Sequence, residues 1–168
     1  VRSRGLGDVY KRQELPRALD AGLSSVMVKE VVYQAVDYLG IGRVRPFLNI
    51  TNDILAERGV KLPLDGQATT TMDNRLEKGM QTQVEIFGDA MKEAWKNGHI
   101  DRWLAANCFG DYYTRNGLTL AQREMITFCF LAAQGGCEPQ LTAHAGGNMN
   151  LGNDRAFLMK VVSQCLPY

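Results

Sequence analysis

This sequence lacks the features that mark membrane proteins and nucleic-acid-binding proteins. The longest apolar stretch, Met125–Ala133, is interrupted by Thr127 and is far shorter than the ~20 residues that a membrane-spanning helix needs. Lys and Arg total 19 against 18 Asp and Glu, and the net charge of +1 comes without a basic stripe. We therefore expect neither nucleic acid nor a membrane as a partner.

Cysteine is scarce, and its spacing fits no common framework. The four cysteines, Cys108, Cys129, Cys137 and Cys165, follow one another at intervals of 21, 8 and 28 residues. That pattern is neither a disulfide scaffold nor a zinc site. With 168 residues, 45% of them hydrophobic, the chain can bury a core without either. A cytoplasmic protein with reduced thiols is the simplest interpretation.

Residues 1–13 do not resemble the rest of the chain. Residues 8–13, Asp-Val-Tyr-Lys-Arg-Gln, can be back-translated to GATGTGTATAAGAGACAG, which resembles a transposon end used as a sequencing adaptor. We interpret 1–13 as a translated, non-native adaptor segment; an ordinary basic tail is the alternative. The other end stops within a helical pattern, which predicts that C-terminal helices are missing.

The apolar periodicity is helical almost throughout and predicts an all-α fold without strands. Ser24 or Ser25 caps a helix to about Leu39, and Thr119 with Gln122 forms a capping box. Residues 61–71 form a polar linker with Pro63 and Gly66. The expected helices are about 24–39, 44–58, 72–87, 89–96, 100–114, 120–134, 139–150 and a last one capped by Asn153 or Asp154.

A shift of 130 residues reveals a weak internal repeat. Five of 17 aligned positions are identical: Gly22/Gly152, Val31/Val161, Val32/Val162, Gln34/Gln164 and Tyr38/Tyr168. The predicted organisation is the C-terminal helices of a first repeat in 14–60, the linker 61–71, and a truncated second repeat in 72–168.

Glu124 and His144 are the residues best suited to chemistry. Glu124 has apolar helical neighbours, so its carboxyl loses hydration, which suits proton transfer. His144 is one of only two histidines and precedes Gly146 and Gly147, which leave room for another backbone or a ligand. An acid in an ordinary ion pair and a structural histidine are the alternatives.

Cys137 is the third candidate, because a helix N-terminus stabilises a thiolate there. Seven residues separate it from His144, which places their Cα atoms roughly 10 Å apart along a helix. A direct thiolate–imidazole pair is therefore not expected, whereas Gln140, four residues before His144, can reach the ring. A small buried residue in a tight turn is the alternative for Cys137.

Several segments of 72–168 resemble the carboxymuconolactone decarboxylase family, which includes the alkylhydroperoxidase D-like proteins. They are Arg-Leu-Glu-Lys-Gly-Met (75–80), Leu-Thr-Leu-Ala-Gln-Arg-Glu (118–124), Gly-Gly-Cys-Glu-Pro-Gln-Leu-Thr-Ala-His (135–144) and Asn-Leu-Gly (150–152). Residues 18–59 resemble the closing helices of the same domain. The resemblance implies an all-α, multi-helical bundle of the alkylhydroperoxidase D-like type that assembles into trimers or hexamers of domains.

The resemblance implies a lyase that uses acid–base groups without metal or organic cofactor on a small lactone or keto acid. Glu124 and His144 match the family's Glu and His, and Cys137 matches the first cysteine of its peroxidase-type members. Gln140, Asn148 and Arg123 are then the candidate substrate-binding residues.

Two departures from the family keep other functions open. Gln140 stands where peroxidase-type members have a second cysteine, so the usual disulfide cannot close. Gly146 stands where many decarboxylase-like members have Arg. The alternatives are a single-cysteine, peroxiredoxin-type antioxidant activity and a non-catalytic oligomerisation module.

Overall fold

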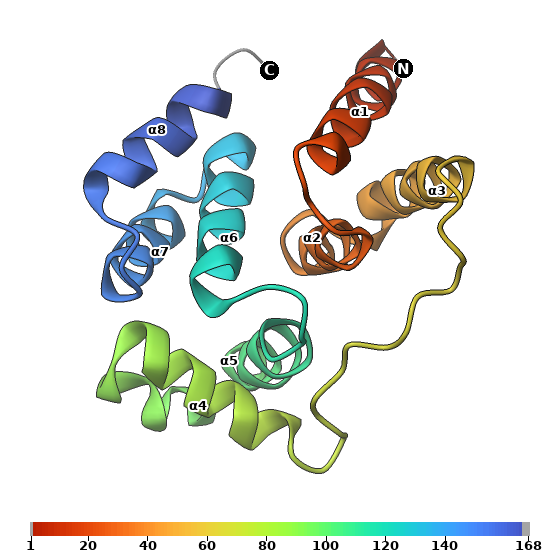
Figure 1. Cartoon of the computed structure of the whole chain (residues 1–168). Coiled ribbons are helices and arrows are strands. Elements are labelled where there is room, and N and C mark those ends of the chain that lie inside the picture. Colours follow the sequence, from red (N-terminus) through yellow and green to blue (C-terminus); the bar gives the residue numbers. More distant parts are fainter. Residues whose placement is uncertain (1, 166–168) are drawn as a thin grey trace. The chain divides into compact units, whose positions relative to one another are not determined.

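The computed structural model describes residues 2–165, and side chains from residue 11 onward (Figure 1). The described residues form helices and contain no strand, so the all-α prediction is confirmed at this level. The chain divides into two compact units, one ending at Gly66 and the other beginning at Gln67.

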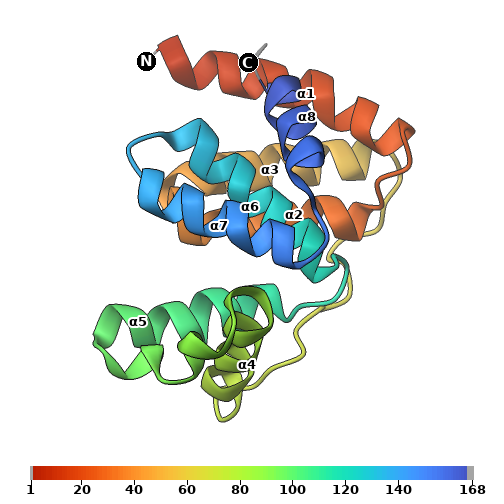
Figure 2. The same ribbon diagram turned by 90° about the vertical axis from the view of Figure 1, so that its left-hand side faces the viewer.

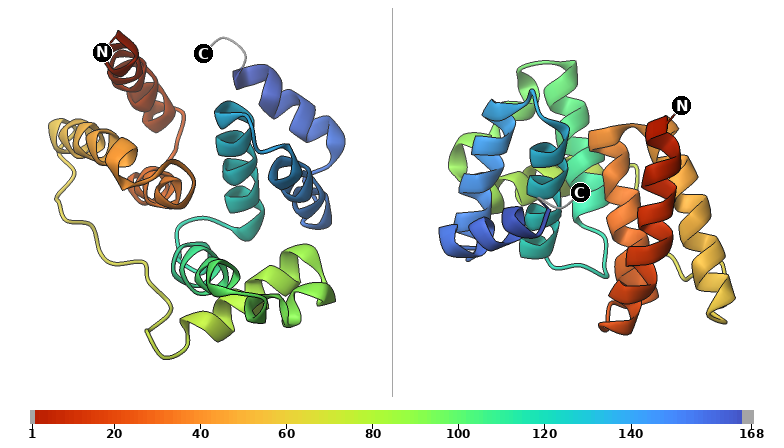
Figure 3. Two further views of the ribbon diagram at one scale, coloured as in Figure 1. Left: turned by 180° about the vertical axis from the view of Figure 1, so that it is seen from behind. Right: turned by 90° about the horizontal axis from the view of Figure 1, so that it is seen from above.

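The first unit contains three helices, α1 (Arg2–Asp20), α2 (Ser25–Leu39) and α3 (Ile41–Glu57). Both α1 and α2 pack on α3, and Figure 3 shows the three side by side. The core consists of Leu15, Val28, Ile50 and Ile54, with Leu19 packed against it. Leu15 and Leu19 explain why the end of α1, a helix that the sequence did not predict, is held in place.

Local signals define the ends of α2 and the start of α3. Ser24 Oγ accepts a hydrogen bond from the amide of Met27 at 3.1 Å, as a helix N-cap does. Gly40 ends α2 with φ of +79°, which side chains with a Cβ rarely adopt. Its carbonyl then accepts from Val44 N at 3.1 Å, so α3 begins three residues before the predicted Val44.

Arg58 connects the ends of α1 and α3. Its guanidinium donates to Asp20 Oδ1 at 2.8 Å and to the carbonyl of Pro16 at 3.2 Å. The hydrogen bond from Arg58 lowers the pKa of the Asp20 carboxyl.

Residues 60–71 contain no helix, and the division between the units falls within them. Their second half is bound to the second unit: Gln67 O accepts from Asn116 N at 3.0 Å, and Thr69 Oγ1 donates to the carbonyl of Thr114 at 2.8 Å. The proposed repeat boundaries stay a prediction.

The second unit begins with α4, continues through several short helical segments, and ends with α6, α7 and α8 (Figure 2). Its elements are α4 (Arg75–Phe87), η1 (Asp89–Lys92), η2 (Ala94–Lys96), α5 (His99–Trp103), η3 (Leu104–Tyr113), α6 (Leu120–Gln134), α7 (Glu138–Asn150) and α8 (Arg155–Cys165). Thr119 and Gln122 form the predicted capping box at the start of α6. Asp154 Oδ1 accepts from Phe157 N at 2.7 Å and caps α8, as predicted.

Two predictions in this unit were wrong in detail. The helix expected at 89–96 consists of two short 3₁₀ turns, and the helix expected at 100–114 is a short α-helix followed by the wider π-helix η3. In η3 the carbonyl of Gly110 accepts side-chain hydrogen bonds from Thr70 at 3.0 Å and Thr114 at 2.6 Å. Such competing donors favour departure from regular α-helical bonding.

Glycine allows α4 to lie directly against η3. A Cβ on Gly79 would lie 1.7 Å from the carbonyl oxygen of Ala105, and one on Gly110 would lie 2.1 Å from that of Arg75. No side chain fits at either contact. This backbone approach places Phe87, at the end of α4, beside the candidate site described next.

Candidate active site

Glu124 on α6 and His144 on α7 are in direct contact. Nδ1 of His144 lies 2.8 Å from Oε2 of Glu124. The Glu124 side chain is fully buried, whereas 12% of the His144 side chain is exposed. The two residues predicted to act together therefore form a dyad, in which the imidazole is the member nearer to solvent.

Tyr113 and Thr127 support the other oxygen of the Glu124 carboxyl. The hydroxyl of Tyr113, at the end of η3, donates to Glu124 Oε1 at 2.8 Å. Thr127 Oγ1, one turn beyond Glu124 on α6, lies 2.5 Å from the same hydroxyl. Because the single proton of Tyr113 goes to Glu124, Thr127 donates to Tyr113. Both carboxyl oxygens are thus hydrogen-bonded, as a buried carboxylate requires.

The edge of an aromatic cluster fixes the His144 ring. Phe87, the last residue of α4, meets the imidazole edge-on, with ring centroids 5.3 Å apart and planes at 81°. The ring centroid of Phe109 lies 5.9 Å from that of Phe87 and 4.7 Å from that of Tyr113. A continuous row of ring contacts therefore runs from His144 through Phe87 and Phe109 to Tyr113, and its two end residues are the ones that bond to Glu124.

Gly147 lets α7 come close enough for the dyad to form. A Cβ there would lie 2.7 Å from Ile86 Cγ2, 2.8 Å from Glu124 Oε2 and 2.9 Å from Phe87 Cε1. A Cβ on Gly146 would meet nothing within 4 Å. Of the two glycines predicted to leave room near His144, Gly147 admits neighbouring side chains and Gly146 faces open space.

Asn148 is fully buried and joins α6 to α7. Its amide nitrogen donates to the carbonyls of Glu124 at 3.0 Å and His144 at 2.8 Å. Its oxygen accepts from Asn153 at 2.9 Å, and Asn153 also donates to the carbonyl of Ala121 at 2.9 Å. Both amide hydrogens of Asn148 are already used, so this geometry favours positioning of the dyad over contact with a substrate.

Arg123 is buried and bonds to backbone carbonyls of its own chain. Its side chain is fully buried, and its guanidinium donates to the carbonyl of Arg115 at 2.9 Å and of Asn116 at 3.4 Å. These bonds fasten the loop after η3 to the start of α6. The location argues against the predicted contact with a substrate.

The structure does not bring Cys137 and Gln140 to the dyad. Cys137 is the N-cap residue of α7, and its thiol donates to the carbonyl of Leu131 at 3.4 Å. Gln140 is exposed, and Nδ1 of the His144 ring is bonded to Glu124. Neither contact supports a thiol-based site at His144.

The geometry sets the chemistry available to the dyad. A carboxylate can only accept, so Nδ1 of His144 carries the hydrogen and Nε2 carries the ring's lone pair. Nε2 is then the atom that takes up a proton, and the Glu124 carboxylate stabilises the imidazolium that forms. The arrangement is therefore suited to general acid–base catalysis.

Sequence reasoning missed Tyr113, Phe87 and Asn153. Tyr113 precedes Glu124 by 11 residues across a helix break, and Phe87 precedes His144 by 57, so no helical spacing connects either pair. Asn153 was noted only as a possible cap. A fold was needed to place all three at the site.

Comparisons with family profiles, with curated proteins and with solved structures gave no match. Among the described residues, no three His, Cys, Asp or Glu side chains come together as metal ligands. No helix in the same part of the chain is long and apolar enough to cross a membrane.

Proposed function

We propose that this chain is an acid–base enzyme of the carboxymuconolactone decarboxylase type, acting without a cofactor on a small lactone or keto acid. The observation that carries the proposal is the Glu124–His144 contact of 2.8 Å, with the carboxyl fully buried and the ring nearer to solvent. The family resemblance supplies the reaction class, and the geometry supplies the acid and base.

In the proposed reaction the substrate carries its carboxylate on the carbon next to a carbonyl, or at the vinylogous position of a lactone, and loses it as CO₂. The electrons of the broken carbon–carbon bond pass into an enolate. The imidazolium of His144 delivers its Nε2 proton to the enolate carbon and becomes neutral again, and solvent restores the proton. Glu124 holds the imidazolium in place through Nδ1, while Tyr113 and Thr127 hold the Glu124 carboxyl.

The environment of Cys137 supports this reaction class over a peroxidase. Its thiol bonds to the backbone carbonyl of Leu131, and Gln140 replaces the cysteine that would resolve an oxidised thiol. The expected trimer or hexamer stays part of the proposal. Exposed Met149, Phe157 and Met159 on or near α7 and α8 are apolar surface that an oligomer would cover.

The test measures CO₂ release from a panel of small γ-lactone carboxylates and β-keto acids. General acid–base catalysis contributes about 10²–10⁴-fold, so His144→Ala should lose at least about 100-fold in kcat. Glu124→Gln should also lose activity, because an amide cannot stabilise an imidazolium. His99→Gln is the matched histidine control, because His99 is exposed and on α5.

Two outcomes contradict the proposal. One is full CO₂ release in His144→Ala; peroxide consumption that is lost in Cys137→Ser would then favour the single-cysteine peroxidase. The other is absence of turnover by the unmodified chain across the panel while it is folded by circular dichroism, which favours a non-catalytic module.

A further inference from the structure

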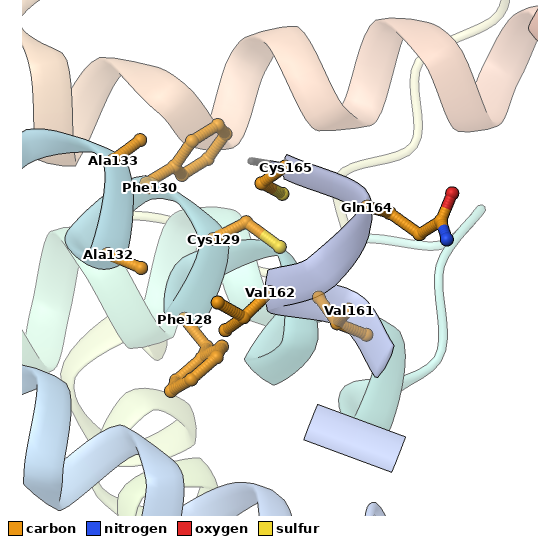
Figure 4. Close-up of a pocket in the computed structure, with 9 residues that line it drawn as sticks. All are labelled: Phe128, Cys129, Phe130, Ala132, Ala133, Val161, Val162, Gln164 and Cys165. Carbon is orange, nitrogen blue, oxygen red and sulfur yellow. The ribbon is translucent and has the colours of Figure 1, made fainter. Parts of the chain in front are cut away.

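An apolar pocket of about 600 Å³ lies between α6 and α8, and neither Glu124 nor His144 lines it (Figure 4). Its walls are mostly small aliphatic and aromatic side chains, and two of its lining residues are cysteines. The lining residues are Phe128, Cys129, Phe130, Ala132, Ala133, Val161, Val162, Gln164 and Cys165.

The two cysteines of this pocket interact although they come from different helices. Cys129 is on α6 and half-buried, and Cys165 ends α8 and is exposed. Burial raises the pKa of the Cys129 thiol to about 12, and the charge of Cys165 and a side-chain hydrogen bond with it act in the same direction. Both cysteines line the same pocket, and Figure 4 shows their side chains facing one another from α6 and α8.

We propose that Cys129 and Cys165 form a dithiol site that small disulfides oxidise reversibly to an intramolecular disulfide. The class of oxidant is a low-molecular-weight disulfide such as glutathione disulfide. This site is separate from the Glu124–His144 dyad and does not use Cys137, whose thiol bonds to the carbonyl of Leu131.

The two thiols have different parts in the reaction because they differ in exposure. The exposed Cys165 loses its proton to solvent, and its thiolate attacks one sulfur of glutathione disulfide. The glutathione disulfide bond breaks, one glutathione thiolate leaves, and a mixed disulfide forms on Cys165. Cys165 is then no longer a thiolate, so its charge no longer opposes ionisation of Cys129.

Cys129 completes the exchange. It gives up its proton, and its thiolate attacks Sγ of Cys165. The Cys165–glutathione bond breaks, and the second glutathione leaves as a thiolate. Each of the two glutathione thiolates takes up one of the protons that the two cysteines released. The balance is two protein thiols oxidised to one disulfide and one glutathione disulfide reduced to two thiols. The product covalently joins the end of α8 to the middle of α6 across their shared pocket.

The experiment treats the full chain with glutathione disulfide at neutral pH, quenches free thiols with iodoacetamide in denaturant, and measures intact mass and tryptic peptides. The tryptic peptide 124–155 contains both Cys129 and Cys137, so tandem mass spectrometry assigns the disulfide from which of the two cysteines carries the iodoacetamide label. The expected product is a monomer in which the peptides containing Cys129 and Cys165 are linked. It carries two iodoacetamide labels, on Cys108 and Cys137, where the reduced chain carries four, and dithiothreitol reverses the change. Because this measurement uses the unmodified chain, it does not depend on a variant that folds poorly.

Substitutions then distinguish the attacking thiol from the resolving thiol. Cys129→Ser should stop at the mixed disulfide and gain the mass of one glutathione on Cys165, whereas Cys165→Ser should stay mostly reduced. Cys137→Ser, with thermal melting as a check on folding, should form the same internal disulfide as the unmodified chain.

Three results would overturn the proposal. They are a mixed disulfide that persists on Cys165 in the unmodified chain, a disulfide that fragmentation places on Cys108 or Cys137, and a product that is a disulfide-joined dimer.

Discussion

Glu124 is fully buried, and each oxygen of its carboxyl group faces a hydrogen-bonding side chain. Tyr113 contacts one carboxyl oxygen and His144 contacts the other, each at 2.8 Å. A carboxyl group buried without such partners would cost several kcal/mol, so these donors are a condition for keeping an acid in the core. Tyr113 is the donor that sequence reasoning did not identify, and it can be removed without altering the dyad itself.

The first prediction concerns the Tyr113 hydroxyl. Tyr113→Phe keeps the aromatic ring but removes the donor to Glu124, and should lower the free energy of unfolding by about 1–3 kcal/mol. Urea unfolding measures the change. In a chain that already carries Glu124→Gln, the same substitution should lower the free energy of unfolding by clearly less, because residues 113 and 124 interact. If Tyr113→Phe lowers the free energy of unfolding equally with and without Glu124→Gln, the hydroxyl acts through other contacts.

At the scale of elements, the approach of α7 to α4 and α6 depends on one glycine. Gly147 lies against Ile86, Phe87 and Glu124, and a Cβ there would come within 3 Å of all three. The adjacent Gly146 faces open space on the same helix. Neither glycine has a positive φ, so space and not backbone strain distinguishes them.

The second prediction compares these two glycines. Gly147→Ala should destabilise the chain by about 1–3 kcal/mol through overpacking, and should reduce activity by moving His144 relative to Glu124. Gly146→Ala should be neutral or stabilise by about 0.5–1 kcal/mol, because alanine favours a helix interior. Thermal melts of the two variants measure the contrast. The same change in melting temperature for both would contradict the packing argument.

At the scale of the whole molecule, the chain is divided into two units. The segment between them contains an exposed lysine after which trypsin can cut. Residues 60–66 are outside helices, and Lys61 is exposed. From Gln67 onward, hydrogen bonds to Gly110, Thr114 and Asn116 attach the chain to the second unit. Exposed backbone outside helices is the preferred site of proteolysis.

The third prediction is an early tryptic cut after Lys61. Brief digestion should give a fragment that begins at Leu62 and contains the whole of the second unit, identified by mass spectrometry. Lys61→Gln should remove this early fragment while leaving later ones. First cuts after Arg155 or Lys160, both within α8, would contradict the expectation that exposed backbone outside helices is cut before helices are.

The sequence by itself determined the helical class and several helix ends. Ser24, Thr119 and Asp154 were recognised as caps, and the structure shows each accepting the expected backbone hydrogen bond. Capping involves residues within three or four positions of one another, so the information is local. The same reasoning singled out Glu124 as an acid in an apolar setting and His144 as its partner on the next helix.

Only the tertiary structure decided which residues complete the site. Tyr113 reaches Glu124 because η3 ends beside α6, and Phe87 reaches His144 because Gly79 and Gly110 bring α4 against η3. Arg123 and Asn148 are both buried and donate to backbone carbonyls, and their predicted contact with a substrate stays a prediction. Such contacts depend on how helices pack, and helical periodicity specifies which face of a helix is apolar without specifying which helix it will meet.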